Sequence, residues 1–267
     1  MAKITEESRI RFETKSTPYR ELIKKYQQRE KMLLDKIKQE ESGTAYSKIQ
    51  LVDDAIYMAT IYMTINKMSV AILDTKNNDA LEQARKSLMR ANMYLGEVVT
   101  KLIDAPYSEY SEKLEELENF PIQKRYYLIC KFGLAIDMLI DDFGDNTKWR
   151  WTWVDLRGDY ATVAKNLLDM AAAGRDYFDP NMQDYEVTVR YVRLLKELFE
   201  DSSEQFRNKY ELSTRRIDDM RKAIQYALAL KRIYTLMGDK ENSEEMKKKA
   251  EVWRLRMDSD QKEGRSN

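Results

Sequence analysis

The sequence predicts an all-α protein of elongated shape, built from stacked antiparallel helical hairpins. The chain contains only 8 glycines and 4 prolines among its 267 residues, below the average usage of about 7% and 5%, so helices are rarely interrupted. Apolar residues recur at intervals of three and four along most of the chain, which is the spacing of one helical face. Because only short turns separate these periodic segments, consecutive helices are expected to run antiparallel.

Residues 1–105 are predicted to form a long helical hairpin region. Thr17 and Pro18 have the form of an N-cap followed by proline at the first helical position, and Pro106 marks the end of the region. The predicted helices of this region are 18–41, 45–75 and 79–104. At about 1.5 Å per residue the second helix is roughly 45 Å long, which favours an elongated molecule.

Residues 106–121 are predicted to form a connector, because Pro106 and Pro121 bracket a short charged segment. The C-terminal region, residues 122–267, is predicted to be a helical bundle. It opens with a strongly apolar helix that stops at Gly144. The predicted helices of the bundle are 122–143, 159–175, 181–201, 203–211, 213–237 and 243–258.

The last helical hairpin resembles a tetratricopeptide repeat. The residues that have the spacing of the small and aromatic positions of that motif are Leu230, Tyr234, Gly238, Ser243 and Ala250. Lys231 and Lys247 depart from the motif, because a small and a bulky apolar residue are expected there. No second copy follows at a period of about 34 residues, so we predict one hairpin of this type and not a repeat array.

The composition excludes several classes of function. The chain has 46 Lys and Arg and 46 Asp and Glu, so its formal net charge is zero, which argues against nucleic-acid binding driven by bulk charge. Histidine is absent, which removes histidine-based triads, histidine-ligated zinc and the commonest general base. We therefore predict that the protein is not an enzyme and holds no cofactor or metal. Cys130 is the only cysteine, so no intramolecular disulfide forms, and we expect a small core residue.

One acidic motif offers an enzymatic alternative. The string Asp141-Asp142-Phe143-Gly144-Asp145 resembles the magnesium-diphosphate motif of isoprenoid synthases, in which carboxylates from two facing helices bind magnesium. The second acidic motif of that pattern is absent from the sequence, and the glycine is typical of a helix end. We interpret the string as a solvated acidic helix terminus.

A segment rich in methionine and tyrosine is the first candidate contact surface. The apolar and aromatic residues that lie largely on one of its helical faces are Tyr57, Met58, Ile61, Tyr62, Ile65 and Met68. Core burial is the default interpretation of such a stripe. Because the helix is apolar on more than half of its circumference, it is either central or bound by a partner. A protein contact through Tyr57 and Tyr62 is therefore the alternative.

Three tryptophans form the second candidate contact surface: Trp149, Trp151 and Trp153, with Arg157 nearby. Their period of two predicts either a short extended segment or a helix start with aromatic residues on two faces. Because the three side chains cannot all enter one helical stripe, we expect at least one at the surface or at a joint between hairpins. Tryptophan and arginine are favoured anchors of protein contacts. Burial at a domain joint and a carbohydrate-binding platform are the alternatives.

Two features of the sequence bear on location. It contains no stretch of 18 uncharged apolar residues, and its N-terminal segment has no apolar region of the signal-peptide type. We therefore expect a chain that does not insert into a membrane. A removed signal peptide is compatible with the Met-Ala start, so both a periplasmic and a cytoplasmic location stay open.

The chain resembles the periplasmic flagellar coiling and sheath proteins of spirochaetes, particularly the Leptospira type. The segments that carry the resemblance are Tyr57–Met68, Trp149–Tyr160 and the two long N-terminal helices. The resemblance implies a periplasmic structural protein, with its signal peptide removed, that contacts flagellar filament proteins and copies of itself and imposes the curvature needed for motility. The alternative is a tetratricopeptide-like helical adaptor that binds a protein partner in a groove.

Overall fold

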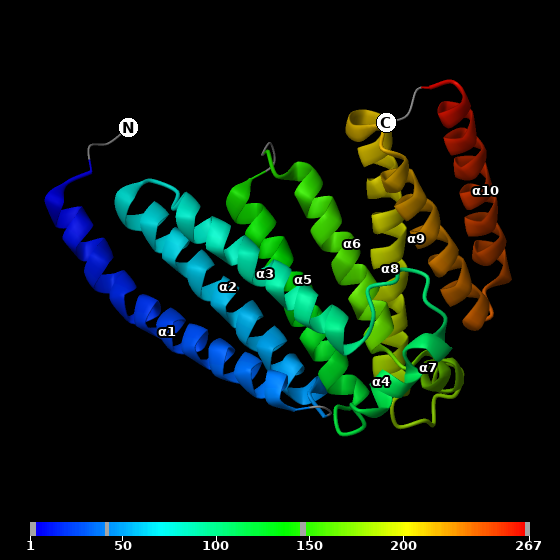
Figure 1. The fold of residues 1–267 in the computed structure, drawn as a ribbon, viewed down its shortest axis with the longest axis horizontal. Coiled ribbons are helices and arrows are strands. Elements are labelled where there is room, and N and C mark those ends of the chain that lie inside the picture. The colour runs from blue at the N-terminus through cyan, green and yellow to red at the C-terminus, as the bar shows by residue number, and fades with distance from the viewer. Residues whose placement is uncertain (1–3, 41–42, 145–147, 265–267) are drawn as a thin grey trace. The chain divides into compact units, whose positions relative to one another are not determined.

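The computed structural model describes residues 4–40, 43–144 and 148–264, and all regular secondary structure in these ranges is helical (Figure 1). The predicted all-α fold of helical hairpins is confirmed. The chain divides into two compact units. Unit 1 comprises Met1–Val98 and Leu128–Thr147, and unit 2 comprises Val99–Tyr127 and Lys148–Asn267.

Unit 1 contains α1 (Glu6–Gln39), α2 (Ala45–Leu73), α3 (Asn78–Val98) and the larger part of α5 (Ile122–Phe143). The central position belongs to α2, which packs against both α1 and α3. The buried residues of one core cluster in this unit are Phe12, Ile23, Ile61, Ile65 and Ala80. This cluster joins all three of the N-terminal helices.

The first helix begins at Glu6, so the start predicted at residue 18 is wrong. Thr5 is the N-cap, and its hydroxyl oxygen accepts a hydrogen bond from the Ser8 backbone N–H at 3.2 Å. Pro18 lies inside the helix, where it removes one backbone donor. Packing compensates for this loss, because Phe12, on the N-terminal side of the proline, is buried in the core of unit 1.

Helix α2 is long and apolar enough to cross a membrane by length and composition, and 44% of its most apolar 18-residue window is buried. A core helix passes the same test. Its residue Asp54 is 3% exposed and is held by Arg29 Nε at 2.9 Å and by Gln50 Nε2 at 3.0 Å. Burial raises the pKa of Asp54, and the Arg29 guanidinium opposes that shift. This ion pair, in which the carboxylate is buried and the guanidinium is partly exposed, joins α2 to α1.

Unit 2 contains the start of α5 and the following elements: η1 (Tyr107–Glu109), α4 (Ser111–Glu115), α6 (Arg150–Leu167), α7 (Met170–Asp176), α8 (Tyr185–Lys209), η2 (Tyr210–Thr214), α9 (Ile217–Leu236) and α10 (Lys240–Lys262). Helix α8 packs against α6, α7 and α9, and α9 also packs against α10. Each of these contacts is made within unit 2.

This division differs from the predicted regions 1–105, 106–121 and 122–267. Residues 128–143 of α5 group with the N-terminal helices, and residues 106–121 are part of unit 2. Two lysines account for the position of α5: Lys131 is ion-paired with Asp53 of α2, and Lys76 Nζ donates to the carbonyl oxygens at the end of α5. Pro106 and Pro121 mark turns in the chain, but the contacts made by Lys131 and Lys76 place most of α5 in unit 1.

Three predicted helix boundaries in unit 2 are also wrong. The helix predicted over 159–175 begins earlier, at Arg150, and breaks after Leu167. The break has a local cause, because the Asp169 carboxylate caps α7 by accepting hydrogen bonds from the backbone N–H groups of Ala171 and Ala172, both at 2.9 Å. Helix α8 runs without the break predicted near residue 202.

The segment 99–106 is irregular, so the helix predicted to residue 104 ends too late. The side chains of Asn166 and Lys165, both on α6, each donate to two backbone carbonyls of this segment, at 2.9 to 3.3 Å. The accepting carbonyls belong to Thr100, Leu102, Ile103 and Ala105. These two buried side chains replace the partners that a helix would have provided.

The last predicted hairpin is formed by α9 and α10. Gly238 has a φ of +72°, the left-handed conformation that commonly ends a helix. Asp239 then caps α10 by accepting a hydrogen bond from the Asn242 backbone N–H at 3.2 Å. Ser243 and Ala250 are buried, so the small residues of the tetratricopeptide-like pattern lie on the packed side of α10.

Candidate functional site

The tryptophan segment forms the start of α6. Trp149 is the residue before the helix and Trp151 lies in its first turn, and both side chains are partly exposed. Each has a cation over its ring: Lys148 Nζ lies 4.8 Å from the Trp149 ring centroid, and Arg150 Cζ lies 5.0 Å from that of Trp151. The sequence predicts either an extended segment or the start of a helix here, and the structure shows the start of a helix. The structure places these two aromatic side chains at the surface of unit 2.

The other two residues predicted for this surface differ in burial. Trp153 is only 6% exposed, and Arg157, one turn further along α6, is partly buried. At about 100° per residue, Trp149 and Trp153 lie about 40° apart on the helix and Trp151 lies about 160° from each of them, so the three side chains do not share one face. Within this segment only Trp149 and Trp151 offer accessible aromatic area.

The two predicted contact tyrosines belong to unit 1. Tyr57 is 39% exposed, and its ring centroid lies 5.1 Å from that of Tyr26 on α1. Tyr62 is partly buried, burial raises the pKa of its hydroxyl, and Gln27 Nε2 lies 3.5 Å from its oxygen. The members of the same stripe that are buried as core residues are Met58, Ile61 and Ile65. Tyr57 and Tyr62 thus lie near α1, while the tryptophans belong to the other unit.

Helix α3 exposes two methionines that the sequence analysis did not select. Met89 and Met93 are 45% and 39% exposed and are one helical turn apart. The sequence indicates that these methionines are exposed, because both lie on the same helical face as the charged residues Lys86 and Glu97. Exposed methionines are suited to irregular protein contacts.

The acidic motif lies at the C-terminal end of α5. Asp141 is exposed and Asp142 is partly buried, while Asp145 is outside the described residues. Lys76 Nζ donates to the carbonyl oxygens of Asp142 at 2.9 Å and Phe143 at 3.2 Å, so a cation compensates the negative helix end. Within the described residues, no group of three or more Cys, His, Asp or Glu side chains is arranged to hold a metal ion.

A second candidate site is a pocket in unit 2, formed by the start of α6, the end of α8 and the start of α9. Its volume is about 490 Å³. We call it the charged pocket, because its lining consists of Gln225 and seven charged residues: Asp155, Lys209, Arg216, Asp218, Asp219, Arg221 and Lys222. Four of these are cations and three are carboxylates, so the lining has a formal charge of +1.

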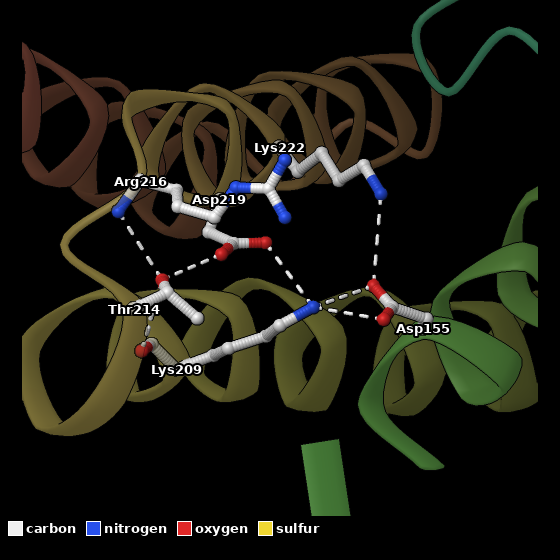
Figure 2. Close-up of polar contacts among 6 residues, drawn as sticks. All are labelled: Asp155, Lys209, Thr214, Arg216, Asp219 and Lys222. Carbon is white, nitrogen blue, oxygen red and sulfur yellow. Dashed lines mark hydrogen bonds and ion pairs between the residues drawn. The ribbon is translucent and has the colours of Figure 1, made fainter. Parts of the chain in front are cut away.

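Figure 2 shows the ion-pair network of the charged pocket, with Lys209 at its centre. Lys209 is 8% exposed, and its Nζ donates to both carboxylate oxygens of Asp155 at 2.8 Å. The same nitrogen lies 3.2 Å from Asp219 Oδ1, whose other oxygen accepts from the Thr214 hydroxyl at 2.7 Å. Lys222 Nζ lies 3.7 Å from Asp155 Oδ1. The buried cation is fully engaged inside the fold, whereas Lys222 lies nearer the solvent.

The backbone beside the charged pocket has two uncommon features. The chain leaves α8 through a π-helical turn, η2, and Arg215 then adopts a left-handed conformation with a φ of +51°. Arg216 follows, and its backbone N–H donates to the Thr214 hydroxyl at 3.2 Å. Both features are costly for non-glycine residues and occur preferentially at functional sites. They precede Arg216, which lines the pocket, whereas Arg215 Cζ lies 5.8 Å from the Tyr210 ring centroid.

Aromatic packing supports the floor of the charged pocket. Phe206 and Tyr226 are stacked with ring centroids 5.5 Å apart, and Lys209 Nζ and Lys222 Nζ lie 5.5 and 5.0 Å from the Phe206 ring centroid. Gly158 of α6 lies against this pair, since a Cβ there would meet Phe206 Cε2 at 2.5 Å. The glycine therefore allows α6 to approach α8 and α9 closely.

The comparisons with known proteins give one result. A family model described as the TP0443 family matches residues 8–261, almost the whole chain. No curated protein and no solved structure shows significant similarity to the chain. The family is of Treponema or spirochaete type, which agrees with the spirochaete character of the predicted resemblance. Because the match covers both units, the chain belongs to the TP0443 family.

Proposed function

We propose that this protein is a non-catalytic structural protein of the flagellar filament sheath, which contacts the filament core and neighbouring sheath subunits and imposes curvature for motility. The observation that carries the proposal is that Trp149 and Trp151, at the start of α6, are partly exposed, with a cation over each ring. Such aromatic and cationic anchors dominate the energy of protein interfaces. The spirochaete type of the family is consistent with this role, and the sheath location in the periplasm is part of the proposal.

Co-sedimentation with isolated spirochaete flagellar filaments tests the proposal. We expect Trp151→Ala to weaken pelleting at least tenfold, because a central tryptophan contributes about 2 kcal/mol or more. The matched control is Tyr127→Ala, which removes an aromatic side chain that is 71% exposed elsewhere in unit 2. Equal pelleting of wild type and Trp151→Ala, with both chains folded, would remove this tryptophan from the contact.

A helical adaptor is the second candidate function. It is favoured by an exposed apolar cluster where α7 and α9 end: Phe178 is 59% exposed and Leu236 is 40% exposed, and Lys196 Nζ lies 4.8 Å from the ring centroid of Tyr234. An adaptor would bind one partner with a fixed stoichiometry. Phe178→Ala would then weaken partner binding, and filaments would not pellet the wild-type chain.

A further inference from the structure

The irregular segment 99–106, which we call the strap, buries few of its apolar side chains. Its apolar anchors lie near the two ends, where Val99 is 0% exposed and Ala105 is 5% exposed. Between them, Leu102 is 58% exposed and Lys101 is also exposed. Local opening requires the least free energy where few apolar contacts are buried, so the middle of the strap depends on the hydrogen bonds that hold its backbone.

Two neighbouring residues of α6 provide these hydrogen bonds. Lys165 Nζ and Asn166 Nδ2 each donate to two carbonyl oxygens of the strap, at 2.9 to 3.3 Å. Both side chains are buried, with Lys165 5% and Asn166 0% exposed. The strap therefore closes over two polar side chains whose donor groups are bound to its backbone.

The closed strap leaves both side chains in an unfavourable environment. Asn166 Oδ1 is buried, and within the described residues it accepts no hydrogen bond. Lys165 is charged at neutral pH, and the carboxylate that faces it, Asp104, is already paired with Arg232 Nε at 3.1 Å. A buried acceptor without a partner and a buried charge both cost free energy relative to water. Access of water on opening would therefore relieve two penalties at once.

Charged and titratable groups of the strap, η1 and α9 face the Lys165 amine. Burial lowers the pKa of this amine from 10.5 to about 8, and the Asp104 carboxylate opposes the shift. Arg232 of α9 lowers the pKa further, and Glu109 of η1 raises it. The Tyr110 ring centroid lies 5.6 Å from Nζ. Burial raises the pKa of the Tyr110 hydroxyl, so the charge of this tyrosine does not change below its ordinary pKa of about 10.

We propose that the strap is a conformational device of unit 2, which opens and recloses at neutral pH without global unfolding and exposes the Lys165 amine to water whenever it is open. The strap directly follows α3, where the chain passes from unit 1 to unit 2, so opening frees the chain between α3 and η1. The contacts described above belong to unit 2, and the proposal is independent of the filament contact.

Opening of the strap is coupled to proton binding. In the open strap the exposed lysine has its ordinary pKa of 10.5, whereas in the closed strap its pKa is about 8. The open strap therefore binds more protons between these two values, and opening becomes less favourable as the pH rises. The two values predict that the equilibrium constant for opening falls about 25-fold from about pH 7 to about pH 9.5.

Thiol labelling of the full chain tests the proposal. Cys130 is the only cysteine, so Cys130→Ser combined with Ala105→Cys places a single thiol in the closed strap. Its labelling rate, divided by the rate of the same variant unfolded in urea at each pH, gives the equilibrium constant for opening. If circular dichroism shows that Ala105→Cys is not folded, Val99→Cys is the probe, because cysteine is smaller than the valine it replaces. The matched control is Ala227→Cys, at a position of α9 that is 0% exposed.

Near neutral pH, we expect the Ala105→Cys thiol to be labelled at least about tenfold faster than the Ala227→Cys thiol, since the control requires global unfolding. The fall of about 25-fold by about pH 9.5 should disappear in Lys165→Met. It should persist in Lys113→Met, which removes the donor to the Val99 carbonyl. Equal labelling of the two thiols would overturn the proposal, as would an opening constant that is independent of pH or a pH dependence that survives Lys165→Met. Filament pelleting is a separate measurement, so either proposal can fail without the other.

Discussion

Lys165 provides a quantitative test of the packing in unit 2. This lysine of α6 is 5% exposed, and burial lowers its pKa from 10.5 to about 8, with the Asp104 carboxylate opposing the shift. The unfolded chain therefore binds more protons than the folded chain between these two values. The free energy of unfolding should rise with pH in that window, because the burial of a charged amine ceases to oppose folding once the amine is neutral.

The size of the effect follows from the two pKa values. A lysine with a folded pKa of about 8 and an unfolded pKa of 10.5 contributes a rise of about 2 kcal/mol between about pH 7 and about pH 9.5. Tyrosines act in the opposite direction only at higher pH. Burial raises the pKa of Tyr107 to about 12. Its ionisation therefore lowers the free energy of unfolding only above about pH 10, the ordinary pKa of tyrosine. The window between about pH 7 and about pH 9.5 isolates the lysine.

Urea unfolding at several pH values in this window is the assay, with wild type compared to Lys165→Met. The variant keeps the length of the side chain but cannot titrate, so the rise of about 2 kcal/mol should disappear. Lys113→Met is the matched control. Lys113 is exposed, and its Nζ donates to the Val99 carbonyl oxygen, in the same region, at 2.7 Å. An identical pH dependence in wild type and Lys165→Met would refute the reasoning.

Two further predictions follow from the contacts of α6 and α5. Gly158→Ala should lower the free energy of unfolding by about 1–3 kcal/mol, as overpacking does. The added Cβ would lie 2.5 Å from Phe206 Cε2 and 2.8 Å from the Tyr226 hydroxyl oxygen. A melting temperature equal to that of the wild type would contradict this prediction. Asp142→Asn should leave filament pelleting and folding unchanged, since an amide oxygen can still accept the hydrogen bond between Asn66 and this side chain and Lys76 contacts only the backbone carbonyl; a magnesium-dependent activity abolished by this substitution would instead support the isoprenoid-type alternative.

The sequence predicts helices best where the boundary signal is local. The predicted helices 45–75 and 122–143 agree closely with α2 and α5, because turn residues or a proline flank them. The start predicted at Pro18 is wrong, since a proline at a helix start and one inside a long helix look the same in sequence. The end of α3 at Val98 could not be predicted either, because the carbonyls that follow it are satisfied by Asn166 and Lys165, which are distant in the chain.

The two candidate sites also differ in how far each can be recognised from the sequence. The tryptophan segment stands out in the sequence, and two of its three aromatic side chains are accessible in unit 2. The charged pocket does not stand out, because Lys209 and Asp155 are 54 residues apart and meet only through the packing of α6 against α8. Arg216, which also lines this pocket, follows a π-helical turn and the left-handed Arg215, and an arginine at a left-handed position carries no glycine signal in the sequence.

The most direct test of the proposed sheath role is the pelleting of the purified wild-type chain with spirochaete flagellar filaments from which the sheath has been removed. The account predicts saturable pelleting, with a constant number of chains bound per unit of filament length. An absence of pelleting under conditions that preserve the filaments would contradict the sheath role.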